Sequence, residues 1–444
     1  MAGSGFSRRR FLKQTTAAGG ALATGALGAG ALATGALPAA TPATTAPAGE
    51  APAAGATDPP AAPAPGEAMG YRSLGRTGLK VSEIGFGGYP VDDPDIIRYA
   101  LDRGINYLDT SHCYRGGRSE TTIGEALRGR RDRVILTTKW CPHHIGRPAK
   151  KQVFLDMLDQ SLKRLQTDHV DIVLNHEVGK SSDGIGLGRL QNPEMFEAFE
   201  AARRAGKARF LGASGHDPDL MGVMHHAVDS GRFDVLLCRY SFLDYPEQDR
   251  LIDKAHAKGV GFVAMKTLAG AKGADLDRFR GRHATFKQAA LKWVLSNARV
   301  SNLVISINSA RQVDEYVPAS GQPLRQADAD ILKEYEEAFS TQVCRYSGAC
   351  LPECPENVRI ADILRFSMYY HEYRQENRAL ESYAKLVASE RAAHCVNCSG
   401  FCEQACAYDL PIRTLLIGAH ERLAPGAACP APGVSGPPDP GRES

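Results

Sequence analysis

The stretch Val81-Ser-Glu-Ile-Gly-Phe86 is a short apolar and β-branched run, and similar runs recur along the next 230 residues or so. Each is followed by a segment with helical apolar spacing, as in Phe154, Met157, Leu158, Ser161, Leu162 and Leu165. We predict strands at 81–86, 106–109, 133–138, 170–175, 209–214, 233–238, 260–265 and 303–307. Eight strand–helix units in about 250 residues predict an α/β fold, a (β/α)₈ TIM barrel.

A doubly wound parallel sheet is the competing architecture. Its dinucleotide-binding form needs Gly-x-Gly-x-x-Gly between the first strand and its helix. Gly85-Phe86-Gly87-Gly88 follows the first strand here, and this single glycine-rich turn is weak evidence for that motif. The barrel is therefore the better prediction.

Four ionisable residues fall at or just beyond the C-terminal ends of predicted strands, which is where barrel enzymes carry their chemistry. They are Asp109, Tyr114, Lys139 and His176. Taken singly, each is as well explained as a cap or a structural residue. Four such residues on one rim favour a catalytic site.

Their joint chemistry suits proton transfer. A tyrosine hydroxyl ionises near pH 10, and a nearby ammonium such as that of Lys139 is expected to lower this value. Asp109 would keep the lysine charged, and His176 would orient a carbonyl oxygen. The group predicts a proton donor aimed at an oxygen that becomes alkoxide-like.

These residues lie in segments that resemble the aldo-keto reductase family. Tyr71-Arg-Ser-Leu-Gly-Arg-Thr-Gly-Leu-Lys-Val-Ser-Glu-Ile-Gly-Phe-Gly-Gly88 is similar to its opening hairpin and first strand. Asp109-Thr-Ser-His-Cys-Tyr114, Gly117-Arg-Ser-Glu120 and Ile123-Gly-Glu-Ala-Leu127 resemble its signature. The similarity continues through residues 161–172 and 206–214, and spans 71 to about 317.

The resemblance implies a nicotinamide cofactor, usually NADPH, and a small carbonyl or alcohol substrate. It implies the catalytic tetrad Asp109, Tyr114, Lys139 and His176. It also implies cofactor-binding positions near the ribose, carboxamide, nicotinamide ring, pyrophosphate and adenosine. These are Gly87, Gly88, Tyr89, Ser214, Tyr240 (stacked on the nicotinamide ring), Met265, Lys266, Leu268, Gly270, Ser306 and Arg311.

Some positions depart from the family pattern. Gly215 stands where Asn often follows the carboxamide serine, Leu237 replaces a common glutamine, and Arg115 replaces a glycine. The adenosine-phosphate segment reads Ser306-Ile-Asn-Ser-Ala-Arg-Gln-Val-Asp-Glu315, with serine for the expected glycine. Arg311 is either a contact for a 2′-phosphate or an ordinary surface residue, so the choice between NADP and NAD stays open.

The sequence has 11 cysteines, and seven of them lie in two short runs. Cys344-x₂-Ser347-x₂-Cys350-x₃-Cys354-Pro355 has ferredoxin spacing with serine at the second position. The other run is Cys395-x₂-Cys398-x₃-Cys402-x₃-Cys406. In two-cluster ferredoxins the fourth cysteine of a run serves the other cluster.

Applied here, that rule predicts one [4Fe–4S] cluster on Cys354, Cys395, Cys398 and Cys402. Cys344, Cys350 and Cys406 remain for a second site, which is [3Fe–4S], serine-ligated or empty. Disulfides and zinc are the alternatives. A branch of the aldo-keto reductases has a similar C-terminal ferredoxin-like extension, and residues 355–364 and 410–416 resemble its segments.

In the barrel, Cys113 and Cys141 follow neighbouring strands. They either pair in an oxidising compartment or are small buried hydrophobic residues.

The N-terminus reads Ser7-Arg-Arg-Arg-Phe-Leu-Lys13, followed by a charge-free segment over 14–49. This pattern is typical of a twin-arginine export signal, and a disordered basic tail is the alternative. It predicts recognition by the twin-arginine export machinery and a periplasmic or extracytoplasmic location, with retention at the membrane where the signal is not cleaved. That route exports folded proteins with cofactors already inserted, which suits an iron–sulfur protein.

Composition bounds the remaining possibilities. Hydrophobic residues make up 43% and charged residues 23%, which predicts a folded core. A net charge of +3 without a basic run after residue 13 argues against nucleic acid as a partner. The predicted organisation is a signal (1–37), a Pro/Ala-rich linker (38–70), a barrel (71–320), an iron–sulfur unit (325–424) and a disordered tail (425–444).

The sequence therefore predicts an exported oxidoreductase that moves hydride between a nicotinamide and a carbonyl or alcohol. Its cluster would exchange electrons with a redox partner protein or brace the fold. Two alternatives stay open: an iron–sulfur electron-transfer protein on a barrel that no longer uses nicotinamide, and a non-catalytic scaffold that binds a ligand or partner.

Overall fold

The computed structural model describes residues 69–141, 149–176, 186–215, 220–243, 247–268, 285–339, 342–371 and 375–424. The predicted signal, nearly all of the predicted linker and the predicted tail lie outside these residues. In the described part of the chain, no helix is both long and apolar enough to cross a bilayer.

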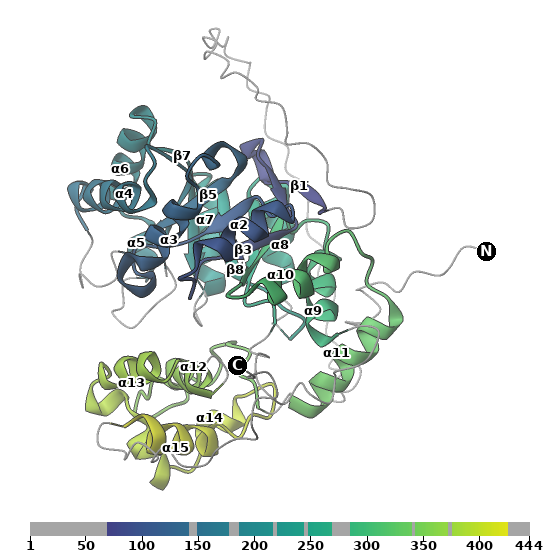
Figure 1. The fold of residues 1–444 in the computed structure, drawn as a ribbon. Helices are drawn as coiled ribbons and strands as arrows, with labels where there is room; N and C mark the ends of the chain where they lie inside the picture. The colour runs from purple at the N-terminus through teal and green to yellow at the C-terminus, as the bar shows by residue number, and fades with distance from the viewer. Residues whose placement is uncertain are drawn as a thin grey trace, which may run out of the picture. The chain divides into compact units, whose positions relative to one another are not determined.

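Eight parallel strands close into a barrel in the order β10-β3-β4-β5-β6-β7-β8-β9, and helices alternate with them along the chain (Figure 1). The strands are β3 (Ile84–Gly87), β4 (Tyr107–Asp109), β5 (Ile135–Trp140), β6 (Val170–Asn175), β7 (Ala208–Gly215), β8 (Val235–Arg239), β9 (Gly261–Met265) and β10 (Asn302–Ser306). The (β/α)₈ prediction is confirmed. Every residue of β5 and β6 is buried, as expected for parallel strands covered by helices on the outside.

The helices of the barrel are α2 (Pro94–Asp102), α3 (Arg118–Ala126), α4 (Lys151–Leu165), α5 (Gly186–Leu190), α6 (Pro193–Arg204), α7 (Leu220–Ser230), α8 (Glu247–Ala257), α9 (Phe286–Leu295), α10 (Ala310–Tyr316) and α11 (Gln326–Phe339). The predicted apolar face of α4 is the one it buries: Phe154, Leu158, Leu162 and Leu165 all pack inward.

A two-stranded hairpin, β1 (Tyr71–Ser73) and β2 (Lys80–Ser82), closes the N-terminal end of the barrel. Leu74 and Val81 belong to the same buried cluster as barrel residues such as Val263. The turn approaches β9 so closely that a Cβ at Gly75, whose φ is +52°, would lie 2.3 Å from the Gly261 nitrogen. Glycine is therefore required there.

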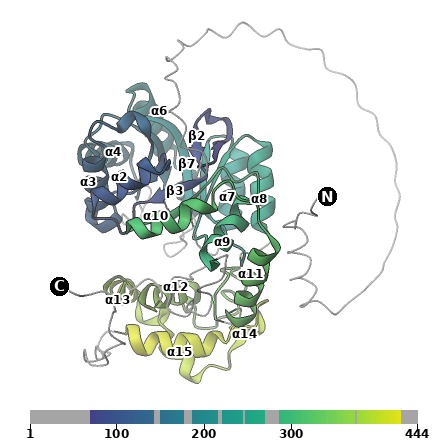
Figure 2. The same cartoon turned by 45° about the vertical axis from the view of Figure 1, so that its right-hand side comes forward.

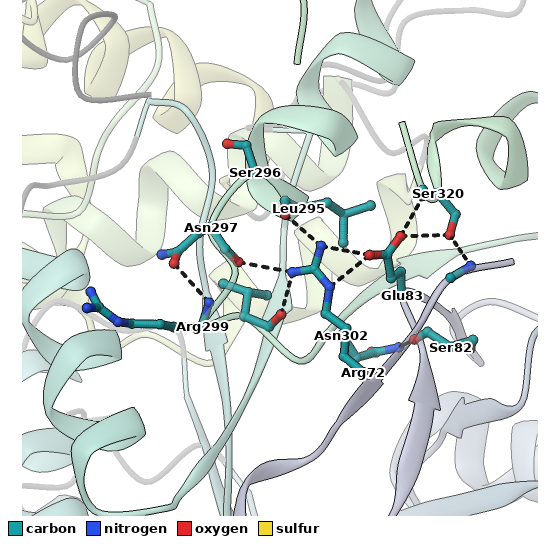
Figure 3. A network of polar contacts seen from close by, with 12 residues as sticks. Arg72, Ser82, Glu83, Leu295, Ser296, Asn297, Arg299, Asn302 and Ser320 are labelled. Carbon is teal, nitrogen blue, oxygen red and sulfur yellow. Dashed lines mark hydrogen bonds and ion pairs between the residues drawn. The ribbon is translucent and has the colours of Figure 1, made fainter. Parts of the chain in front are cut away.

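A partly buried ion pair between Arg72 and Glu83 holds the hairpin in place (Figure 3). Arg72 donates to Glu83 and to the backbone carbonyls of Leu295, Asn297 and Val300. Glu83 also accepts from the Ser320 hydroxyl and the Gly321 N–H. Burial alone would raise the pKa of Glu83, but the Gly321 N–H and the Arg72 guanidinium lower it below its ordinary value.

The C-terminal segment forms a second hydrophobic core of its own. Its helices are α12 (Ile360–His371), α13 (Glu376–Ala384), α14 (Phe401–Gln404) and α15 (Ile412–Leu423), and α12 and α15 pack side by side (Figure 2). Six of the seven cysteines of the two runs, all except Cys398, pack in or against this core. We call this part of the chain the cysteine module (residues 342–371 and 375–424).

Helix α11 falls within the predicted iron–sulfur unit, but it packs on the barrel instead. Tyr335 stacks on Phe286 of α9 at 4.4 Å between ring centroids, and Lys292 donates to Asp328 over 3.1 Å. The change from barrel to cysteine module thus comes after Phe339, because the apolar face of α11 is complementary to α9.

Candidate active site

The four predicted catalytic residues meet at one end of the barrel. Asp109 ends β4, Lys139 lies near the end of β5, His176 follows β6, and Tyr114 begins the turn after β4. All four line a single cavity of about 1480 Å³ at the C-terminal ends of the strands. This is the position that barrel enzymes use for catalysis.

Lys139 and Asp109 form a fully buried ion pair. The Lys139 Nζ lies 2.5 Å from Asp109 Oδ1 and 2.7 Å from the Thr110 carbonyl oxygen. Burial raises the pKa of Asp109, and the Lys139 ammonium opposes that rise. The pair fixes a positive charge below Tyr114, since Nζ lies 4.7 Å from the centre of the Tyr114 ring.

The effect on Tyr114 differs from the expectation. Burial raises the pKa of the Tyr114 phenol well above 10.0, and the Asp109 carboxylate raises it further. The Lys139 ammonium beneath the ring does not reverse this rise. Tyr114 is therefore a protonated donor at neutral pH rather than a group tuned toward phenolate.

His176 lies next to two cysteines. Its Nδ1 is 2.9 Å from Cys141 Sγ and 3.7 Å from Cys113 Sγ, and the two sulfur atoms are 3.0 Å apart. Neither cysteine forms a disulfide. Hydrogen bonding from Cys141, followed by that from His176, lowers the pKa of Cys113. The His176 ring also meets the Tyr114 ring edge-on at 6.1 Å.

Most of the predicted cofactor positions line the same cavity. They are Gly87, Tyr89, Ser214, Met265, Lys266, Leu268 and Ser306. The Ser214 hydroxyl is buried without a hydrogen-bond partner among the described residues, and the Thr267 hydroxyl is in the same situation. Two buried polar groups at this wall fit a ligand that carries its own donors and acceptors.

Three cofactor predictions are not supported by the geometry. Tyr240 packs away from the cavity against Trp293 and Phe262, and its hydroxyl donates to Asp249 of α8. Gly88 serves packing, since a Cβ there would lie 2.8 Å from Ser119 Oγ. Arg311 is exposed on α10 and does not line the cavity.

Gly270 lies outside the described residues.

Several cavity residues were not predicted. Asn308 and Gln312 lie in the predicted adenosine-phosphate segment after β10, so the sequence could have indicated them. Phe366, Tyr369 and Arg378 come from α12 and α13 of the cysteine module. Arg378 lies over the Tyr89 ring at 4.9 Å and lowers the pKa of Tyr114. No local pattern links these residues to a tetrad more than 180 residues earlier.

Four cysteines of the module line a second, smaller cavity. They are Cys354, Cys395, Cys398 and Cys402. These are the four that the ferredoxin rule groups together. The Val358 N–H points at Cys354 Sγ and the Gly400 N–H at Cys398 Sγ, each over 3.4 Å. Burial and the neighbouring thiols raise the pKa of both Cys395 and Cys402 to about 11.

The other three cysteines, Cys344, Cys350 and Cys406, lie close enough to influence one another. Burial raises the pKa of Cys350 to about 12, with Cys344, Cys402 and Cys406 contributing in the same direction. The Tyr346 N–H points at Cys344 Sγ over 3.4 Å. Thiols this close to one another resist joint ionisation unless a cation lies among them.

Comparison with known proteins places the barrel in a family. The Aldo/keto reductase family profile matches residues 89–282. L-galactose dehydrogenase of Arabidopsis thaliana is 30% identical over 283 residues, which cover 56% of this chain and 87% of that protein. The holo form of aldo-keto reductase AKR11C1 from Bacillus halodurans aligns with a TM-score of 0.50 and 26% identity, over 60% of this chain and 96% of that one.

The structure of an aldo-keto reductase from Klebsiella pneumoniae in complex with NADPH shares the fold, with a TM-score of 0.50 and 24% identity over 60% of this chain and 94% of that one. The chain belongs to the aldo/keto reductase family, and it is an aldo-keto-reductase-like oxidoreductase. These alignments cover at most about three fifths of this chain.

Proposed function

We propose that the protein transfers hydride between a nicotinamide cofactor, NADPH in preference to NADH, and a small carbonyl or alcohol substrate. The observation that carries this proposal is the buried Lys139–Asp109 pair beneath Tyr114, with His176 on the same cavity. Family membership supports it independently.

Each of the four residues has a distinct role in the proposed proton transfer. Tyr114 stays protonated because burial raises its pKa, so it donates its proton to the carbonyl oxygen as negative charge develops there. Lys139 stabilises the developing charge on the phenol oxygen, and Asp109 holds the ammonium in place. His176 orients the carbonyl oxygen, and in alcohol oxidation the same proton returns to Tyr114.

The cavity wall fits a nicotinamide cofactor, which when bound supplies or accepts the hydride. Ser214 offers an unpartnered buried hydroxyl, and the backbone after β9 (Met265 to Leu268) and Ser306 line the same wall. Gly87 lines this wall as well, and glycine there also allows close packing of β3 on β10, since a Cβ would meet the backbone of Ile305 at 3.0 Å. Asn308 and Gln312 take the adenosine side in place of Arg311.

We also propose a [4Fe–4S] cluster on Cys354, Cys395, Cys398 and Cys402. The support is their arrangement around one cavity, together with backbone N–H groups aimed at two of the sulfurs. Such a cluster supplies one-electron transfer when bound, and N–H groups near its sulfurs tune its potential. Cys344, Cys350 and Cys406 offer three ligands for a second cluster.

Export by the twin-arginine route to an extracytoplasmic location, and electron exchange with a partner protein, complete the proposal. Their support is the N-terminal sequence pattern and the cluster itself.

The test uses the full chain, expressed with its signal and purified without air. The proposal expects about four to eight irons per chain with matching acid-labile sulfide. It also expects saturable NADPH binding, followed by cofactor fluorescence, and NADPH oxidation with a panel of aldehydes and ketones.

Iron and sulfide without any nicotinamide binding would favour the electron-transfer alternative. Nicotinamide binding with zinc in place of iron would support the proposed reductase activity and contradict the proposed iron–sulfur cluster.

A further inference from the structure

Four side-chain atoms that could ligate a metal lie close together after the C-terminal ends of three neighbouring strands. Ser111 and Cys113 follow β4, Cys141 directly follows β5, and His176 directly follows β6. Ser111 Oγ lies 3.1 Å from Cys113 Sγ and 3.0 Å from Cys141 Sγ. The two sulfurs and His176 Nδ1 all lie within 4.8 Å of one another.

The donor set has the chemistry of a zinc site. Two thiolates and an imidazole are preferred zinc ligands, and a serine hydroxyl or a water completes a tetrahedron. Ideal zinc bond lengths place two ligand sulfurs about 3.8 Å apart and a sulfur and a nitrogen about 3.5 Å apart. The observed separations are 3.0 Å between the sulfurs, and 2.9 Å and 3.7 Å from the nitrogen to the two sulfurs. An outward movement of less than 1 Å suffices to admit the ion.

The surroundings supply both rigidity and access. Cys141, Ser111 and His176 are buried, at 1%, 0% and 7% exposed, so three donors are held by the barrel. Cys113 is partly exposed and lines the large cavity, so its side chain has room to move and an ion has an entry path. His176 is further fixed by its backbone N–H, which donates to the Trp140 carbonyl over 2.9 Å.

We propose that Cys113, Cys141 and His176, with Ser111 as a fourth donor, bind one zinc ion at the rim of the barrel. This site is separate from the cysteine module, since all four residues belong to the barrel. A disulfide between Cys113 and Cys141 is the competing outcome, and it would use only two of the four converging donors.

The seven cysteines of the module can also take up metal, so the experiment is a difference measurement on the full chain. Protein purified without air and with its module cysteines intact is titrated with Co²⁺, and then Zn²⁺ is added to displace it. The variants are C113S, the double variant C113A/C141A, and the control C238A. Cys238 is a buried thiol of β8 outside the group.

The proposal expects the wild type and C238A to bind one more metal ion per chain than C113A/C141A. The difference spectrum is expected to show thiolate-to-cobalt charge transfer and the strong d–d bands of a tetrahedral site, both lost on adding Zn²⁺. C113S changes only one partly exposed atom, so this variant should stay folded even where the double variant does not. It should weaken Co²⁺ binding at least tenfold.

Equal Co²⁺ affinity of wild type and C113S, with both folded by circular dichroism, would overturn the proposal. So would a Cys113–Cys141 disulfide, mapped by alkylation without reduction, that on reduction yields a protein with no extra cobalt. None of these readouts depends on catalytic activity, so they remain decisive if the proposed reductase function fails.

Discussion

Lys139 Nζ lies 2.5 Å from Asp109 Oδ1, and at 1% and 3% exposure neither residue is accessible to solvent. A buried pair of this kind is costly to break on one side only, because the remaining charge keeps no partner. The pair is thus both a structural element of the barrel and the source of positive charge under Tyr114.

The K139M variant should lose about 3 to 5 kcal/mol of stability, because it leaves Asp109 buried and unpaired. The double variant K139M/D109L should recover most of that stability, since apolar replacement of both partners is often neutral. Chemical denaturation measures both. Activity should stay absent in the double variant, which separates the pair's chemical role from its structural one. Equal stability of K139M and wild type would contradict the expected role.

Tyr114→Phe should lower turnover by about 10²- to 10⁴-fold, because the proton donor is lost while the ring remains. NADPH affinity, measured by fluorescence titration, should be unchanged. Tyr99→Phe, a partly exposed tyrosine of α2, is the matched control and should keep full activity.

The raised pKa of Tyr114 also predicts how the reaction rate depends on pH. An acid whose pKa is raised stays protonated up to that raised value, so kcat/KM for carbonyl reduction should show no Tyr114 ionisation below pH 10.0. A pH–rate profile from 6 to 10 checks this in wild type. A titration near neutrality that disappears in Tyr114→Phe would show that the phenol is more acidic than its surroundings imply.

Tyr240→Phe and Ser214→Ala should change different properties: the first should lower stability, and the second should lower cofactor affinity. Tyr240 packs behind the barrel wall, so its variant should lose about 1 kcal/mol of stability with its hydrogen bond to Asp249 and keep its NADPH affinity. Ser214 faces the cavity, so its variant should bind NADPH about fivefold more weakly, equivalent to about 1 kcal/mol. Thermal denaturation and fluorescence titration of the two proteins test the pair, and unchanged NADPH affinity of Ser214→Ala would contradict its contact with the cofactor.

Glu83→Gln should make stability less dependent on acid. The pKa of Glu83 is lower in the folded protein than its ordinary value of 4.5, so the carboxylate stabilises the fold above that pH and loses this effect as the pH falls through the folded pKa. Wild type should be more stable than the variant at pH 7, and the two should converge as the pH falls below the folded pKa of Glu83. Glu197→Gln, in an exposed pair with Lys151, is the control and should shift nothing measurable.

Cys354→Ser should lower the iron content of anaerobically purified protein by up to about four per chain, since it removes one ligand of the proposed cluster. Cys238→Ser lies in β8 of the barrel and should keep the full iron and sulfide content. Unchanged iron in Cys354→Ser would mean that the cysteines are grouped differently from the ferredoxin rule.

Seven of the eight barrel strands were predictable from sequence to within two residues at each end, because continuous apolar runs mark buried parallel strands. The first prediction, 81–86, joined two strands: β2 ends at Ser82 and β3 begins at Ile84. The chain turns there at Glu83 from the hairpin into the barrel wall, and the apolar pattern does not show that break.

The tetrad was predictable because strand ends are visible in sequence and share one rim of a barrel. Tyr240, predicted to stack on the nicotinamide, is not among the residues that line the cavity. It follows the end of β8, where the direction of a side chain depends on packing against α8 and α9. The contributions of Tyr369 and Arg378 to the cavity depend on tertiary contacts between distant segments. The pKa of Tyr114 was misjudged because the sequence does not show that Asp109 and burial together outweigh the lysine.

The pairing of β10 with β3 has a consequence for how the protein is made. Asn302 of β10 donates to the Ser82 carbonyl across 220 residues of sequence, so the barrel has two unsatisfied edges until its last strand leaves the ribosome. The four tetrad residues are translated long before then and acquire their geometry only on closure. A nascent chain stalled before residue 302 should therefore remain protease-sensitive and dependent on chaperones, and full protection should appear in one step once β10 and Ser320 have emerged.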